Sequence, residues 1–134
     1  MIKTSLKQLS TNDIIKINNK IIEIYGGYIT NKYISDKIES ILYSCEYYFI
    51  DDVTDFDYKL LAICEILYKF LTCHIFSDGN KRTSWILFDI MLHLNNYTLI
   101  TLSTEDKFNL ILDIINKRVS KEELYQIIKE FLIL

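Results

Sequence analysis

The stretch from His74 to Thr83 reads HIFSDGNKRT and separates two segments with the apolar periodicity of helices. The segment before it, about Asp57 to Cys73, carries an apolar stripe at helical spacing. The segment after it, about Asn80 to Leu94, is apolar on almost every side, which is typical of a buried helix at the centre of a bundle. The loop is therefore predicted to connect two core helices.

The same loop gathers side chains that carry chemistry. Histidine can act as a base near neutral pH, and His74 opens the loop. Asp78 offers a hard oxygen ligand of the kind that Mg²⁺ uses when it also holds phosphates. Gly79 permits a sharp turn, and the helix start that follows it attracts anions. Lys81 and Arg82 add positive charge there. Together these groups indicate transfer of part of a nucleotide to a hydroxyl.

Helical periodicity continues through most of the remaining chain. A first helix is expected from the capping residues at Ser10 to the glycine pair Gly26-Gly27, and a second from Ser35 to about Cys45. Two further helices are expected after Ser103 and Ser120, because each serine begins a capping box, an imperfect one at Ser103. We expect an all-α fold, a compact bundle of about six helices around the buried helix 80–94, in a single domain over residues 1–134.

One segment has the composition of a strand. Aromatic and β-branched residues from Tyr47 are followed by an acidic turn that ends at Asp55. This pattern predicts a short β-hairpin or flap, and a tyrosine-rich surface loop is the alternative.

Composition excludes several classes of protein. The chain of 134 residues is 50% hydrophobic and has a net charge of -3, which favours a folded domain without a general attraction to nucleic acid. Its most apolar stretch, Trp85 to Leu102, contains Asp89 and His93, so no membrane span is expected. An odd number of cysteines and no recognisable secretory signal favour a soluble, cytoplasmic protein.

The loop resembles the signature of the Fic/Doc family, H-(P/I)-F-x-(D/E)-(G/A)-N-(G/K)-R. The residues from His74 to Arg82 fit this pattern without a mismatch. Tyr25-Gly26-Gly27 after the first helix and the buried helix after the loop also resemble death-on-curing (Doc) proteins, so the likeness covers essentially the whole chain. The resemblance implies the Fic/Doc fold, an all-α core whose loop binds a nucleotide with Mg²⁺.

This likeness implies roles for individual residues. His74 would be the general base that deprotonates a target hydroxyl, and Asp78 would hold Mg²⁺. The residues that would bind the phosphates of ATP are Gly79, Asn80, Lys81 and Arg82. Phe76 would anchor the loop, and an aromatic between His74 and Asp78 is also suited to that task on physical grounds.

The transferred group depends on two variable positions. Ile75 and Lys81 resemble Doc toxins, in which the γ-phosphate faces the acceptor, and imply phosphorylation of a threonine of elongation factor Tu, which would block translation. Gly79 instead matches Fic proteins that transfer AMP, so adenylyl transfer is the alternative. A binding module without catalysis is the second alternative.

Segments Ser35–Ser40 and Thr101–Asp106 each miss the last position of the family's self-inhibitory S/T-x-x-x-E-G/N motif. An antitoxin like those of Doc toxins (a Phd-like protein) is therefore the expected inhibitor.

Overall fold

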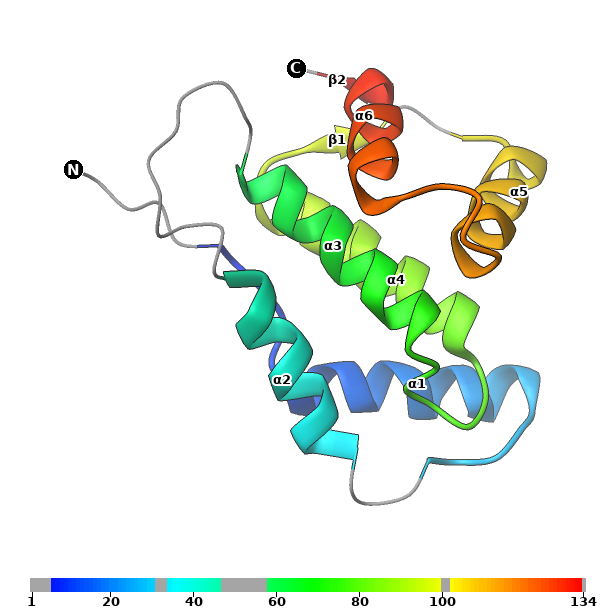
Figure 1. Cartoon of the computed structure of the whole chain (residues 1–134). Coiled ribbons are helices and arrows are strands. Elements are labelled where there is room, and N and C mark those ends of the chain that lie inside the picture. Colours follow the sequence, from blue (N-terminus) through cyan, green and yellow to red (C-terminus); the bar gives the residue numbers. More distant parts are fainter. Residues whose placement is uncertain (1–5, 31–33, 47–57, 100–101, 134) are drawn as a thin grey trace.

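Figure 1 shows the computed structural model of the chain, which describes residues 6–30, 34–46, 58–99 and 102–133. Six helices make up most of this part of the chain, so the predicted all-α fold is confirmed. The helices are α1 (Thr11–Tyr25), α2 (Ile34–Glu46), α3 (Tyr58–Thr72), α4 (Asn80–Leu94), α5 (Thr104–Ile115) and α6 (Lys121–Phe131). Two short strands, β1 (Thr98–Leu99) and β2 (Leu132–Ile133), pair antiparallel and bring the chain after α4 beside the chain after α6.

The helix boundaries follow the capping residues. The Ser10 side chain accepts a hydrogen bond of 3.1 Å from the Asp13 amide, and Gly26 ends α1 with φ of 86°. Ser103 caps α5 in the same way, and Ser120 forms a full capping box with Glu123 at the start of α6. The predicted bounds of α1 to α4 lie within one or two residues of the observed ones, and α5 and α6 begin directly after the predicted serines.

The centre of the bundle is α3 rather than α4. Helix α3 packs against α2, α4, α5 and α6, whereas α4 packs mainly against α1 and α3 (Figure 1). Most residues of α3 are buried, while Ile86 and Leu94 of α4 are more than a third exposed. The sequence predicted that α4 would be the buried central helix, because this helix is apolar on almost every side. Some of these apolar residues lie on its exposed side instead.

The predicted hairpin or flap at Tyr47 to Asp55 lies outside the described residues. Within the described ranges, no helix combines the length and the apolar character that crossing a membrane requires.

Candidate active site

The loop between α3 and α4 begins with an unusual backbone conformation at His74. The preceding amide, that of Cys73, still donates a helical hydrogen bond of 2.8 Å to the Lys69 carbonyl. His74 then adopts φ of 49°, in the left-handed region that residues other than glycine rarely occupy. Such residues cluster at functional sites, where the surrounding structure holds them against their strain. The side chain of His74 is exposed, so a ligand can reach it.

Two apolar residues anchor the loop to the core. Ile75 and Phe76 are both buried, and Phe76 is only 2% exposed. The Phe76 ring lies 6.4 Å, centroid to centroid, from the ring of Phe70 on α3. The predicted anchoring role of Phe76 is therefore confirmed, and the polar residues on either side of this anchor are held at the surface.

Asn80 closes the loop through its side chain. Its Oδ1 accepts a hydrogen bond of 2.9 Å from the Phe76 amide, and its Nδ2 donates one of 2.7 Å to the Phe76 carbonyl. The same Nδ2 lies 3.5 Å from Nδ1 of His74, a long contact that orients the imidazole only weakly. The side chain of Asn80 thus shapes the loop, and what it offers an anion is its backbone amide at the start of α4.

The start of α4 leaves its first amides without a side-chain cap. Gly79 is the N-cap residue, with φ of 77°, and it has no side chain that could accept their hydrogen bonds. The first backbone hydrogen bond of the helix runs from the Thr83 amide to the Gly79 carbonyl. The preceding amides therefore point out of the helix end, where they and the helix dipole favour an anion.

Asp78 is held against the segment that follows α1. Its Oδ2 accepts a hydrogen bond of 2.7 Å from the Tyr28 amide. A Cβ atom at Gly27 would lie only 2.8 Å from Cβ of Asp78, so Gly27 allows this close approach. One carboxylate oxygen is thus oriented by the backbone, which leaves Oδ1 as the oxygen better placed for a cation. Among the described residues, no three His, Cys, Asp or Glu side chains gather as a metal-binding group.

Asn18 of α1 supports the loop through hydrogen bonds of its side chain. It was not among the site residues predicted from the sequence. Its Nδ2 donates hydrogen bonds to the Asp78 carbonyl, 2.9 Å away, and to Oγ1 of Thr83, 3.0 Å away. Asn18 is 1% exposed, and its Oδ1 is buried and has no hydrogen-bond partner among the residues that the structure describes. One signal was available: Asn18 stands four residues after Ile14, on the face of α1 that is buried. A polar residue in a core position indicates a specific hydrogen-bonding task.

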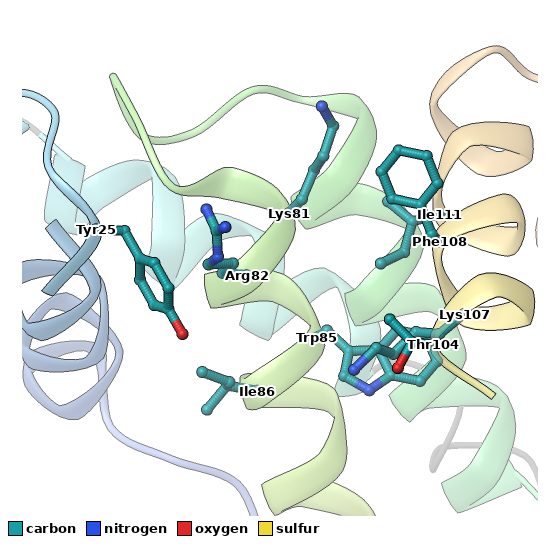
Figure 2. A pocket seen from close by; sticks show the side chains of 9 residues that line it. All are labelled: Tyr25, Lys81, Arg82, Trp85, Ile86, Thr104, Lys107, Phe108 and Ile111. Atoms are coloured by element: carbon teal, nitrogen blue, oxygen red, sulfur yellow. The ribbon is translucent and has the colours of Figure 1, made fainter. Parts of the chain in front are cut away.

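A cavity of about 490 Å³ opens along the exposed side of α4, between the end of α1 and helix α5 (Figure 2). Three of the lining residues are cations, and none of the nine is acidic. The lining residues are Tyr25, Lys81, Arg82, Trp85, Ile86, Thr104, Lys107, Phe108 and Ile111. This cavity is therefore electropositive, although the whole chain has a net charge of -3.

Arg82 is oriented within this cavity by an aromatic ring. Its Cζ lies 3.9 Å from the centroid of the Tyr25 ring, at the end of α1. The stack covers one face of the guanidinium but leaves its N–H edges, which lie in the plane of the group, free to bind oxygen atoms. Lys81 and Arg82 thus line a cavity suited to a phosphorylated ligand.

The structure places all six predicted site residues on one loop and one helix end, but with different surroundings. His74 and Asn80 lie together, Asp78 faces the segment after α1, and Lys81 and Arg82 line the cavity. The arrangement can combine a base, a cation ligand and an anion site around the start of α4.

The sequence is similar to a known protein family. The model of the Fic/DOC family matches residues 8–92, from just before α1 to near the end of α4, and so includes the whole loop. No curated protein matches the sequence.

Proposed function

Since the chain belongs to the Fic/DOC family, whose members are typically transferases, we propose that it transfers the γ-phosphoryl group of ATP to a hydroxyl side chain of a protein. The observation that carries this proposal is the juxtaposition at the start of α4. An exposed histidine, an oriented carboxylate and uncapped helix amides stand at the start of α4. The next residues of this helix, Lys81 and Arg82, line a cavity whose charged lining residues are all cations.

His74 is the proposed general base. It accepts the proton of the target hydroxyl while the hydroxyl oxygen forms its bond to the γ-phosphorus. The bond from that phosphorus to the oxygen of the leaving ADP breaks, and the proton stays on the imidazole until it is released to water. Positioned general bases contribute about 10²- to 10⁴-fold to such rates. The exposure of His74 leaves room for the side chain of another protein.

The phosphates would be held by the start of α4. The amides that follow Gly79 offer hydrogen bonds, Lys81 offers a point charge, and the N–H edges of Arg82 offer a planar pair of donors. Asp78 fits a Mg²⁺ ion, because this ion is commonly bound through one or two carboxylates together with phosphate oxygens and water. When bound, Mg²⁺ supplies positive charge that offsets the charge of the phosphates.

Adenylyl transfer is the alternative reaction at the same site. Lys81, which lines the cavity, and Ile75, which is buried in the core, support the Doc-like phosphoryl transfer by the likeness described above. Gly79, which matches the Fic proteins that transfer AMP, supports the Fic-like reaction by the same likeness. Both reactions use the same base and differ in which phosphorus faces the hydroxyl.

We further propose that the chain is the toxin of a two-gene module that acts in the cytoplasm and modifies elongation factor Tu. An antitoxin encoded by the second gene would silence it. Glu39 and Glu105, the glutamates of the two imperfect self-inhibitory motifs, are exposed, and neither lines the cavity. This supports inhibition by a separate protein. Activity of the chain that appears only after Glu39 or Glu105 is mutated would contradict this part of the proposal.

The test is the intact mass of elongation factor Tu after incubation with the chain and MgATP. Addition of one phosphate is the expected result, and addition of one AMP would replace phosphoryl by adenylyl transfer. An unchanged mass would refute elongation factor Tu as the target. In that case the same incubation with ATP labelled at the γ-phosphate, in a cell extract, tests transfer itself. A label that enters no protein, even with the antitoxin absent, would favour the binding module.

A further inference from the structure

One wall of the cavity comes from outside the part of the chain that matches the family. The match ends at residue 92, whereas α5 begins at Thr104. Four lining residues belong to α5, and Figure 2 shows them facing the side chains of α4: Thr104, Lys107, Phe108 and Ile111. The family match therefore says nothing about what this wall does.

Lys107 is the charged residue of that wall. Its Nζ lies 5.7 Å from the centroid of the Trp85 ring, and the Trp85 ring packs in turn on Phe88, 5.1 Å away. This contact holds the ammonium group beside the cavity. Among the described residues, no carboxylate forms an ion pair with Lys107, and the same holds for Lys81 and Arg82.

Three cations that line one cavity, with no carboxylate partner in the described part of the chain, repel each other when the cavity is empty. An anion that contacts all three removes this repulsion, and a ligand with several negative charges in a row does so best. A phosphate chain has this form. Lys107 neighbours Trp85, one helical turn after Lys81 on α4, so the three cations are spread along the cavity rather than gathered at one point.

We propose that Lys107 is a third phosphate-binding residue of the nucleotide site, placed on α5 across the cavity from Lys81 and Arg82. This inference rests on the proposed function, because it takes the ligand of the cavity to be ATP. It adds that the site has two sides, one from α4 and one from α5. The side from α5 makes the affinity depend on the number of phosphate groups in the ligand.

The competing explanation is structural: Lys107 could serve only to cover the Trp85 ring. The chain provides a matched control for this explanation. Lys129 of α6 lies over the Tyr125 ring at 5.6 Å, nearly the same distance, and it does not line the cavity. Removal of Lys129 therefore reports the cost of losing such a contact without any effect on the ligand.

The experiment measures the dissociation constants of MgATP and of AMP by titration calorimetry for the full chain and three variants. Lys107→Met is expected to weaken ATP binding about ten-fold or more, since a hydrogen bond to a charged group is lost. The loss for AMP should be smaller, because AMP has fewer phosphates to contact. Lys107→Arg should restore most of the ATP affinity, and Lys129→Met should leave it unchanged. The melting temperature of each variant shows whether it is folded.

Unchanged ATP affinity in Lys107→Met, with a fall in melting temperature like that of Lys129→Met, would overturn the inference and leave the proposed function standing. Equal losses of affinity for ATP and for AMP would also overturn the inference, because Lys107 would then not distinguish ligands by their number of phosphate groups. A wild-type chain that binds ATP through Lys107 but transfers no group would refute the proposed function and support the inference. A wild-type chain that binds no ATP would refute both.

Discussion

Replacement of Gly27 by alanine tests whether the position of Asp78 matters for activity. Gly27 has φ of 120°, and an added Cβ would lie 2.8 Å from Cβ of Asp78 and 3.0 Å from its Cγ and Oδ2. Gly26, the preceding residue, also has a positive φ, of 86°, but an added Cβ there would meet no atom of the described residues within 4 Å. Gly26→Ala is therefore a control that introduces backbone strain without touching Asp78.

The expected magnitudes follow from these distances. A residue other than glycine in such a conformation costs about 1–3 kcal/mol, so both variants should lose a similar amount of unfolding free energy. In Gly27→Ala the two Cβ atoms must also separate by 0.6 Å to reach ordinary contact, which begins at 3.4 Å. This shift disturbs the hydrogen bond of 2.7 Å from the Tyr28 amide to the carboxylate. Misplacement by about 1 Å can cost about 10²-fold in rate, so a loss of about 10- to 100-fold is expected.

The assay combines urea denaturation with the rate of group transfer from MgATP. Both variants should lose stability, and only Gly27→Ala should lose the additional factor in rate, with the loss partly recovered at high Mg²⁺ concentration. Equal transfer rates in Gly26→Ala and Gly27→Ala, with both proteins folded, would refute the assignment of Asp78 to the metal.

Two further predictions concern buried groups. Asn18→Ala removes the hydrogen bonds to the Asp78 carbonyl and to Thr83 and should lower the unfolding free energy, measured in urea, by about 1–3 kcal/mol; an unchanged value would show that these bonds add nothing. Burial, and secondarily the charge of Glu65, raises the pKa of the Cys45 thiol from 9.0 to about 11. The unfolded chain then ionises at lower pH than the folded chain, so stability should fall as pH rises from 9.0 to about 11, by about 2–3 kcal/mol. The Cys45→Ala protein should lack this part of the decline, and identical pH profiles would contradict the assignment.

Local signals explain how much of the fold was predictable. Ser10, Gly26, Ser103 and Ser120 mark helix ends through contacts with residues at most four positions away, and these contacts can be read directly from the sequence. The pairing of β1 with β2 joins Leu99 to Leu132. It was not predictable, because strands of two residues are too short to show a periodic pattern in the sequence.

The candidate site likewise has a part that was predictable from the sequence and a part that was not. The loop residues are contiguous, so their combination was visible in the sequence. The partners that orient them are distant: Asn18 reaches Asp78 across 60 positions, and Tyr28 reaches it across 50. Lys107 joins the cavity only because α5 packs against α3 and faces α4 across the cavity. Such contacts depend on how helices pack, and no spacing within the chain specifies them.

The central claim, that His74 is the base of a group-transfer site, is tested most directly by its replacement with alanine. Transfer from MgATP to the protein substrate should fall by about 10²- to 10⁴-fold, with the dissociation constant of ATP unchanged. This combination would show that His74 acts on the reaction and not on ligand binding. Transfer that proceeds at the wild-type rate in His74→Ala would contradict the claim.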